Sequence, residues 1–423
     1  MKVLVIGGGG REHAICWRLS LSPSVSKVYA TPGNPGCATI AQLVQAGSYT
    51  PSGYLALARS LAADLTVVGP EAPLVDGVVD AFETAGLRIF GPTRAAAQLE
   101  GSKIFSKQFM TRHGIPTARF TATDDPAAAR QALDEFTYPL VIKADGLAAG
   151  KGVVIVRDKA EAVATLDSMF GGTLVGDAGL RVVIEEFLTG EEVSFIALSD
   201  GESVLPFEPS QDHKTIFEGD TGPNTGGMGA YSDSRILPPA MRQTVIDTVM
   251  TPTVQGMKAE WMPFKGFLYA GLMMTKDGPK TLEFNVRLGD PETQALLHRL
   301  DGDFGELLME AAAGRLNPSL LGCKPGPSVC VVLAAAGYPG KVRSGDLISG
   351  IPEAESTGAV VFHAGTRSVE AGVATSGGRV LGVTHSGTTL QEAIANVYTA
   401  VDKIAFDGMQ LRRDIGRKGL SRW

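Results

Sequence analysis

The sequence predicts a multidomain protein of α/β and α+β class, with an N-terminal doubly wound parallel sheet and a small C-terminal α+β domain. Three observations predict this. The 423 residues are too many for one compact core. Strand and helix patterns alternate over the first hundred residues, as in parallel sheets with crossover helices. Further along the chain, hairpin patterns and a long glycine-rich segment replace this alternation.

The composition narrows the class of protein. A formal charge of −7 and a pI of about 5.5 argue against a nucleic-acid surface, which needs a basic stripe. The N-terminus lacks the longer apolar region of a signal peptide, and no apolar run approaches the roughly 20 residues of a membrane span. The four cysteines have no metal-binding spacing and are expected to be reduced thiols. We therefore expect a cytoplasmic protein without nucleic-acid or membrane partners.

The N-terminal region, residues 1–101, should form the parallel sheet, with ligands at the carboxyl ends of its strands. The segment after it, "GSKIFSKQFMTRHGIP", has Ser102 to cap a helix, Gly114 to end it and Pro116 to prevent its return. A domain junction is expected near Gly101. Strands are expected at 2–6, 26–31, 64–68 and 87–93, and helices at 11–22, 54–63 and 73–86.

The central region, residues 102–324, contains strand, loop and strand patterns followed by a helix and a further hairpin, with a lid subdomain at about 122–193. The segment 210–231, "SQDHKTIFEGDTGPNTGGMGAY", is polar and glycine-rich and is expected to be a long functional loop. Residues 325–423 show three strand patterns and a helix at 388–406, which predict the C-terminal domain.

A glycine-rich stretch, "VIKADGLAAGKGVVIV", joins two strand patterns. Small residues let backbone N–H groups approach phosphate oxygens, and Lys143 and Lys151 can neutralise their charge. It is not a Walker A loop, because a strand rather than a helix follows Gly152. We interpret it as a hairpin lid over a nucleotide; the alternative is an ordinary flexible hairpin.

Another hairpin pattern, "IEEFLTGEEVSF", spans 184–195. Its strand end could offer backbone groups to an adenine edge, and Glu191 or Glu192 could hold ribose hydroxyls. The alternative is a solvated hairpin with acidic edges.

The stretch "EFNVRLGDPETQ" at 283–294 carries a row of three polar side chains. Because strand side chains alternate faces, Glu283, Asn285 and Arg287 should share one face, with the apolar residues between them facing a core. A carboxylate and an amide oxygen suit Mg²⁺, and an arginine can grip a carboxylate or a transferring phosphoryl group. The alternative is a salt-bridged polar strand face.

The opening "GGGGREHA" follows a strand and begins a helix, where a phosphate binds favourably. A dinucleotide fingerprint would have Gly or Ala at position 12, where Glu12 stands, and an acid after the second strand, where Thr31 stands. A phosphosugar therefore fits better than NAD. The alternative is a purely structural tight turn.

With these motifs, the chain resembles the phosphoribosylamine–glycine ligase (glycinamide ribonucleotide synthetase) family of ATP-grasp enzymes in purine synthesis. The resemblance runs nearly end to end. It rests on "GGREHA", "GPEAPLVDG", "VIKADGLAAGKGV", "SQDHK", "TGPNTGGMGAY", "EFNVRLGDPETQ" and "AAAGYPG". It implies a central ATP-grasp fold and joining of glycine to 5-phosphoribosylamine through a glycyl phosphate, giving glycinamide ribonucleotide, ADP and phosphate.

The resemblance also implies roles for individual residues. ATP is expected to contact Lys103, Lys143, Gly150, Lys151, Gly152, Glu185, Glu186, Phe187, Leu188 and Glu192. Glu283 and Asn285 are expected to bind Mg²⁺ or Mn²⁺. Arg287 and Lys214 are expected to steady the glycine carboxylate or the phosphoryl group, and Asp290 to contact the amine. The substrate site is expected to include Gly8, Gly9, Gly10, Arg11, Glu12, His13, Glu71, Asp212, Asn224, Thr225, Gly226, Gly227 and Met228.

Rival hypotheses remain at this point. The chain could be another ATP-grasp carboxylate–amine ligase or a carboxylase, or a nucleotide-binding regulatory protein without turnover. An NAD-dependent oxidoreductase is disfavoured by Glu12 and Thr31. His113, His298, His363 and His385 are interpreted as structural. A monomer or weak homodimer is expected.

Overall fold

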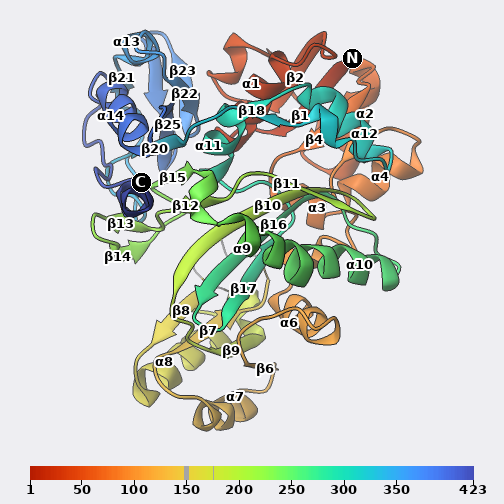
Figure 1. The fold of residues 1–423 in the computed structure, drawn as a ribbon, viewed down its shortest axis with the longest axis vertical. Helices are drawn as coiled ribbons and strands as arrows, with labels where there is room; N and C mark the ends of the chain where they lie inside the picture. Colours follow the sequence, from red (N-terminus) through yellow and green to blue (C-terminus); the bar gives the residue numbers. More distant parts are fainter. Residues whose placement is uncertain (147–151, 175) are drawn as a thin grey trace.

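The computed structural model describes residues 1–146, 152–174 and 176–423. Figure 1 shows the N-terminal and C-terminal parts side by side above a long central sheet, with a smaller lobe below it. The expected multidomain α/β and α+β architecture is confirmed. Within the described ranges, no helix has the length and apolarity needed to cross a bilayer.

The expected parallel sheet of the N-terminal part is confirmed; it has five strands in the order β3-β2-β1-β4-β5, of which β3 was not predicted. Its central strands consist of apolar runs that are fully buried between helices on both faces. The strands are β1 (Lys2–Gly7), β2 (Lys27–Pro32), β3 (Gln42–Leu43), β4 (Leu65–Val68) and β5 (Ile89–Phe90), and the helices are α1 (Gly10–Ser20), α2 (Pro51–Leu61), α3 (Glu71–Val75), α4 (Val78–Thr84) and α5 (Gln98–Gly101).

The single helix expected at 73–86 is in fact two helices, α3 and α4. The break falls at Gly77, whose φ of +87° belongs to the left-handed region that favours glycine. The guanidinium of Arg94 packs against Gly77 and donates to the carbonyl of Asp76, so a side chain at residue 77 would also meet that guanidinium. The prediction was wrong because the apolar periodicity continues across the turn.

Helix α6 (Lys103–Arg112) connects the N-terminal part to the lower lobe, and it begins and ends as predicted. The Ser102 hydroxyl accepts a hydrogen bond from the Phe105 N–H (3.1 Å) and donates to the Asp145 carboxylate (2.9 Å). Gly114 follows the helix with a φ of +64°. The cap therefore also fixes the helix against the strand that carries Lys143.

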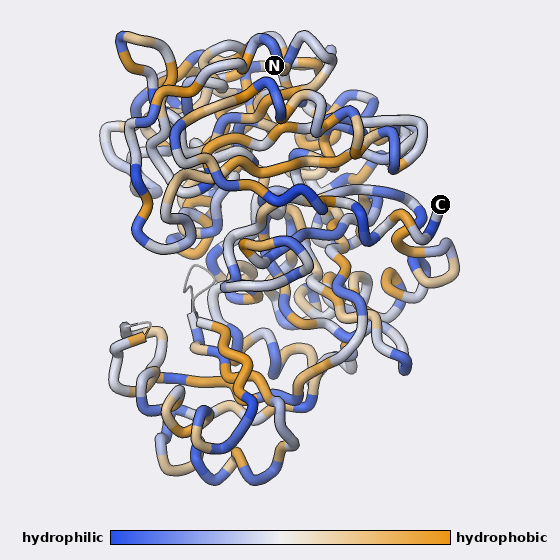
Figure 2. The backbone as a smooth tube through the Cα atoms, turned by 90° about the vertical axis from the view of Figure 1, so that its left-hand side faces the viewer, coloured by the Kyte–Doolittle hydropathy of each residue, from blue (hydrophilic) through white to orange (hydrophobic). Residues whose placement is uncertain are grey.

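The lower lobe is an antiparallel four-stranded sheet in the order β6-β9-β7-β8, with a small hydrophobic core of its own. Figure 2 shows it as a separate body below the rest of the chain. Its elements are β6 (Phe120–Thr123), α7 (Pro126–Ala132), β7 (Leu140–Ala144), β8 (Val153–Val156), α8 (Lys159–Phe170) and β9 (Val182–Glu186).

The central sheet and the C-terminal part share one sheet of nine strands, in the path β17-β16-β10-β12-β15-β20-β25-β22, with β11 beside β10. The central strands are β10 (Glu191–Asp200), β11 (Val204–Pro206), β12 (Ser210–Asp212), β15 (Gly229–Ser232), β16 (Lys265–Thr275) and β17 (Gly278–Asn285). The helices of this region are α9 (Pro239–Val245), α10 (Thr251–Ala259), α11 (Glu292–Arg299) and α12 (Phe304–Ala312), and β18 (Leu300–Asp301) pairs with β19 (Gly322–Cys323).

The segment 210–231 is not a long loop, contrary to expectation. It contains β12, β15 and a hairpin of β13 (Thr215–Phe217) and β14 (Thr221–Asn224). Short polar strands give no apolar alternation, so their pairing could not be read from hydrophobic periodicity.

In the C-terminal part, β20 pairs with β15 on one side and with β25 on the other. Helix α14 contacts both β20 and β25, and a small sheet β21-β24-β23 lies beside them. The elements are β20 (Ser328–Ala334), β21 (Leu347–Ile348), α13 (Ile351–Glu355), β22 (Val360–His363), β23 (Thr366–Val369), β24 (Gly372–Thr375), β25 (Arg379–Ser386) and α14 (Leu390–Val401). The domain bounds expected from the sequence stay a prediction.

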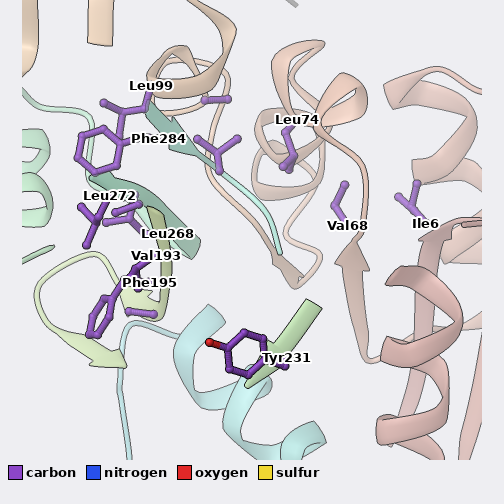
Figure 3. Close-up of a cluster of buried hydrophobic side chains, with 14 of the residues drawn as sticks. Ile6, Val68, Leu74, Leu99, Val193, Phe195, Tyr231, Leu268, Leu272 and Phe284 are labelled. Carbon is purple, nitrogen blue, oxygen red and sulfur yellow. The ribbon is translucent and has the colours of Figure 1, made fainter. Parts of the chain in front are cut away.

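One large hydrophobic cluster connects the N-terminal, central and C-terminal parts. Figure 3 shows Ile6 and Val68 of the parallel sheet, Leu99 beside Phe284, and Tyr231 among its members. A second cluster joins the same parts, and in it the rings of Phe90 and Phe267 lie edge to face, 4.9 Å apart. These three parts therefore form one packed body.

We predict that Phe267→Ala lowers the free energy of unfolding by about 3–5 kcal/mol, because a buried aromatic side chain leaves a cavity when truncated. Urea unfolding followed by circular dichroism measures this. The control, Trp261→Ala, removes a ring that is 92% exposed and should change stability by less than about 0.5 kcal/mol. Equal effects of the two substitutions would contradict the junction described above.

Candidate active site

Glu283 and Asn285 lie on one face of the last strand of the central sheet, and Arg287 follows directly after it. Strand β17 ends at Asn285, earlier than expected, but the alternation continues, since Phe284, Val286 and Leu288 are all buried. Gly271 lies opposite Glu283 on β16, and a Cβ there would lie 3.4 Å from the Glu283 side chain. We call Glu283, Asn285 and Arg287 the β17 row.

Cations surround the Glu283 carboxylate. Burial alone would raise its pKa, but Lys214, Lys143 and Lys103 outweigh burial and hold the pKa below the ordinary value. Glu283 therefore stays ionised.

A buried ion-pair network connects the lower lobe to α6 and β17. The Glu185 carboxylate lies 2.5 Å from the amine of Lys143 and 2.5 Å from that of Lys107. Lys143 also donates to the Leu282 carbonyl (3.2 Å), at the bulge of β17, and Lys107 donates to Thr117 (2.7 Å). Burial lowers the pKa of Lys107 to about 8, against the attraction of Glu185. Lys143 thus reaches the β17 row from the lower lobe.

The other lysines approach from different elements. Lys103, at the start of α6, donates to the Gly146 carbonyl (2.9 Å), and burial lowers its pKa. Lys214 lies 2.5 Å from the Glu192 carboxylate of β10. Burial would lower the pKa of Lys214, but Asp212 and Glu192 hold it well above the ordinary value. Burial raises the pKa of Asp212 to about 6 despite Lys214.

Arg287 is held by carboxylates from the N-terminal part. Its guanidinium lies 2.8 Å from Glu100 and 3.3 Å from Glu71, and it donates to the Asn285 amide oxygen (3.3 Å). Glu100 also accepts from the Val286 N–H (2.8 Å). Burial lowers the arginine pKa, but Glu100 and Glu71 raise it above the ordinary value. Arg287 thereby joins the β17 row to the N-terminal part.

The glycine turn, residues 7–10, is closed by its own side chains. Glu12 accepts from the Gly9 N–H (2.6 Å) and from Arg11 (2.6 Å), and it fills the space beside Gly7, whose φ is +126°. Arg11 also donates to the Leu288 carbonyl (3.2 Å). Both the Glu12 and the Arg11 side chains are buried.

His13 is buried beneath the turn, and its Nδ1 accepts from the His363 N–H of β22 (2.8 Å). Asn34 donates to the carbonyls of Gly8 (3.0 Å) and His363 (2.7 Å). Hydrogen bonds to His363 therefore join the glycine turn to the C-terminal part.

The segment 224–228 reaches the same region from the central sheet. The Thr225 hydroxyl donates to the Lys214 carbonyl (2.7 Å) and accepts from the Gly227 N–H (2.9 Å). Asn224 is exposed, whereas the Met228 side chain is fully buried beside Ile216. Gly227 lies against the Asp290–Pro291 turn, and Gly226 lies against the guanidinium of Arg379.

Asp290 accepts from the Gln294 amide (2.9 Å) and lies 3.3 Å from Arg379 of β25. Burial would raise the pKa of Asp290, but Arg379 and Arg11 hold it below the ordinary value.

The remaining predicted residues lie in the lower lobe and in its link to the central sheet. Glu185 is buried in the ion-pair network, and Glu186 accepts from the Arg119 N–H (2.9 Å). Phe187 is exposed and Leu188 half-buried, in the link from β9 to β10. Gly152 precedes β8, and its carbonyl accepts from the Ala144 N–H (2.8 Å). Gly150 and Lys151 lie outside the described residues.

These residues fit a nucleotide with a divalent cation. An ionised carboxylate and an amide oxygen face the same side as three lysines and an arginine, which matches the hard oxygen ligands of Mg²⁺ and the charge of a polyphosphate. We find no group of three or more His, Cys, Asp or Glu side chains with metal-binding geometry among the described residues.

Several functional candidates were missed by sequence reasoning. Glu100, Lys107 and Arg379 contact predicted residues across long sequence separations. The Ser194 hydroxyl, the Tyr269 hydroxyl and the Glu292 carboxylate form a buried cluster, with Glu292 accepting from both at 3.0 Å. Glu292 lies within the "GDPET" segment already singled out, so its acidity was the one available signal; the others gave none.

Comparison with known proteins decides among the candidate families. Models of the phosphoribosylglycinamide synthetase N domain, ATP-grasp (A) domain and C domain match residues 1–100, 101–293 and 328–418. The chain belongs to the phosphoribosylglycinamide synthetase family. Phosphoribosylamine–glycine ligases of Ralstonia nicotianae and Yersinia pestis are each 50% identical, over 100% of this chain and 100% of theirs.

Solved structures agree with this assignment to the phosphoribosylglycinamide synthetase family. A phosphoribosylamine–glycine ligase from Thermotoga maritima has a TM-score of 0.85 at 33% identity, covering 98% of this chain and 100% of that chain. The biotin carboxylase domain of a Hydrogenobacter thermophilus 2-oxoglutarate carboxylase, in complex with MgADP, has a TM-score of 0.74 at 17% identity, covering 97% and 91%. The second likeness shows the ATP-grasp fold alone. The expected ATP-grasp fold is confirmed, and this fold implies binding of ATP.

We predict that His13 makes the protein acid-sensitive. Burial, with a contribution from His363, lowers its pKa to about 3, whereas an unfolded histidine has a pKa of about 6.5. Between these values the unfolded chain binds a proton that the folded chain does not, so the free energy of unfolding falls as pH falls below about 6.5. Between pH 7 and pH 5 this loss should be about 2 kcal/mol.

The variant His13→Gln keeps a hydrogen-bond acceptor but cannot titrate. Its free energy of unfolding, measured in urea at both pH values, should fall by about 2 kcal/mol less than that of the unmodified chain. Identical pH dependence in the two proteins would show that His13 is not the group responsible.

Proposed function

We propose that the residues assembled around the β17 row carry out the reaction of the family on this chain. In that reaction ATP drives the joining of glycine to 5-phosphoribosylamine, giving glycinamide ribonucleotide, ADP and phosphate. The homologues named phosphoribosylamine–glycine ligase match this chain over their full length. This match supports glycine ligation over the activity of another carboxylate–amine ligase or a carboxylase. The oligomeric state and the compartment remain sequence-based expectations.

The first step is phosphoryl transfer. The glycine carboxylate oxygen attacks the γ-phosphorus of ATP, the bond to the β,γ-bridging oxygen breaks, and glycyl phosphate and ADP form. Lys103 and Lys143 bind the phosphates, and Arg287 and Lys214 hold the glycine carboxylate and the transferred group. Glu283 and Asn285 would hold Mg²⁺ or Mn²⁺, which when bound neutralises charge on the phosphates.

The second step is acyl transfer. The amine of phosphoribosylamine attacks the carbonyl carbon of glycyl phosphate, the bond to the phosphate oxygen breaks, and the amine loses a proton. The acceptor is assigned to the glycine turn, Glu71 and the segment 224–227, with Asp290 near the amine. Water must be excluded from the acyl phosphate, which the lower lobe can do by closing over the nucleotide.

One observation supports joining the two half-sites in this way. Arg287 contacts Asn285, assigned to the metal, at 3.3 Å, and Glu71, assigned to the acceptor, at 3.3 Å. A single guanidinium thus lies between the atoms expected to bind the donor and those expected to bind the acceptor. An acyl phosphate formed beside Arg287 would meet the amine without diffusing.

The adenine is assigned to the link between β9 and β10. The backbone at Phe187 and Leu188 would meet the base, beside Glu185 and Glu186, and Glu192 would meet the ribose. The exposure of Phe187 and Glu192 supports this placement, since both can be reached from outside. Glu192 would then bind ribose hydroxyls in place of Lys214, and Lys214 would be free to bind the phosphates.

We predict that ADP release depends on both substrates. In an assay with ATP and Mg²⁺, omitting either glycine or phosphoribosylamine should reduce ADP formation by at least about a hundredfold, because chemistry requires both half-sites to be filled. ADP formation unaffected by either omission would refute the proposed function. Bicarbonate in place of glycine tests the carboxylase alternative and should give no product.

We predict that Glu283→Ala lowers kcat by at least about a hundredfold while the protein stays folded, because a metal ligand is lost beside the phosphates. The matched control is Asp277→Ala, which removes an exposed carboxylate from the turn of the same β16–β17 hairpin and should leave kcat unchanged. Thermal unfolding checks the fold of both variants. Normal turnover in Glu283→Ala would refute the metal assignment.

A further inference from the structure

Arg379, in the C-terminal part, lies in the region assigned to the acceptor, and no local sequence pattern marks it. Arg379 is the first residue of β25. Its Nη1 donates to the carbonyls of Gly226 (2.6 Å) and Asp290 (2.5 Å), and its Nη2 lies 3.3 Å from the Asp290 carboxylate. Three contacts therefore fix the guanidinium between the segment 224–227 and the Asp290–Pro291 turn.

The segment is held from the other side as well. The Gly226 N–H donates to the Tyr338 hydroxyl (2.8 Å), so both backbone groups of Gly226 are bound by the C-terminal part. A Cβ at Gly226 would lie 3.0 Å from the guanidinium carbon, so the absence of a side chain here allows a close approach of Arg379. The C-terminal part thereby determines the position of a segment assigned to the acceptor.

Arg379 retains binding capacity after these contacts. A guanidinium has five N–H donors, and the contacts above occupy three. Within the ranges that the structure describes, its Nε has no hydrogen-bond partner, and its side chain is 23% exposed. The free Nε–Nη2 edge is the edge that binds a carboxylate or phosphate through two parallel hydrogen bonds.

The contacts of Asp290 place Arg379 near the region assigned to the acceptor. The Asp290 carboxylate oxygens lie 3.8–3.9 Å from the positions that Cβ atoms would occupy at Gly9 and Gly10, where α1 begins. Arg379 therefore lies one side chain away from the glycine turn. The β17 row, which we assign to the nucleotide, contacts the N-terminal part at a different place, where Arg287 pairs with Glu71.

We propose that Arg379 is a binding residue for the phosphate of the phosphoribosyl acceptor, and that it selects phosphorylated over unphosphorylated acceptors. This rests on the proposed function. The phosphate would bind the Nε–Nη2 edge while Nη1 continues to hold Gly226 and the Asp290 carbonyl. The same residue thus positions the segment 224–227 and recognises the ligand that this segment encloses.

The test compares two acceptors that differ only in the phosphate. Phosphoribosylamine and ribosylamine are formed in solution from ammonia with ribose 5-phosphate or ribose, and kcat/KM is measured for each. The ratio of the two values cancels losses that affect both acceptors equally. In Arg379→Gln this ratio should fall by about tenfold to a hundredfold, the loss expected for hydrogen bonds to a charged group.

Tyr338→Phe is the matched control. It removes the other contact to Gly226 but no cation, so it should lower kcat/KM for both acceptors together and leave the ratio within about twofold. An unchanged ratio in Arg379→Gln would overturn the proposal and leave Arg379 with a positioning role only.

A binding measurement covers the case in which ribosylamine turnover is too slow to measure. Ribose 5-phosphate is a stable probe, and its dissociation constant, measured by titration calorimetry, should increase by the same factor in Arg379→Gln. Binding of a non-hydrolysable ATP analogue should not change. Unchanged binding of ribose 5-phosphate would overturn the proposal. Wild-type ADP release that ignores the acceptor would instead refute the proposed function, so the two failures are distinguishable.

Discussion

The arrangement of the site depends on charge balance around Arg287. Its guanidinium is held between Glu100 and Glu71, while Glu283, two residues before Asn285, is surrounded by lysines. A buried charge without a partner costs several kcal/mol, so each of these groups needs the others. The lysines that we propose bind the phosphates, Lys103, Lys143 and Lys214, are paired in this structure with carboxylates and backbone carbonyls. A ligand that carries its own negative charge can replace these partners without leaving a buried cation uncompensated.

This balance also explains the connection between the lower lobe and the body. The lower lobe has its own hydrophobic core, whereas the N-terminal, central and C-terminal parts share two larger ones. The lobe carries Lys143, and Glu185 and Leu282 hold that lysine where α6, β9 and β17 meet. Motion of the lobe would therefore change the position of Lys143, the lysine that we propose binds the phosphates, relative to Glu283. Under the proposed function, this side chain would couple binding of the nucleotide to closure of the lobe.

Local patterns explain what the sequence could predict. Alternation of apolar and polar residues placed Glu283, Asn285 and Arg287 on one side, and an apolar run followed by glycines placed the turn at the start of α1. Both rest on residues close together in the chain. Glu100 and Arg379 could not be found in this way, because their partners lie 187 and 89 residues away and no local pattern marks them. The β13–β14 hairpin was not predicted for a related reason. Polar strands that pair with each other show no alternation of apolar and polar residues.

The continuous sheet gives the acceptor region its rigidity. Strand β15 begins one residue after Met228 and pairs with β20, which in turn pairs with β25, the strand that carries Arg379. The segment 224–227 and the arginine that binds it are thus held by strands of one hydrogen-bonded sheet, and the His363 N–H of β22 binds His13 beneath the glycine turn. Because these contacts belong to the shared body rather than to the lower lobe, the region assigned to the acceptor can keep its geometry while the lobe opens and closes. A reactive acyl phosphate needs such a division, because its acceptor must already be in place when the lobe closes over the nucleotide.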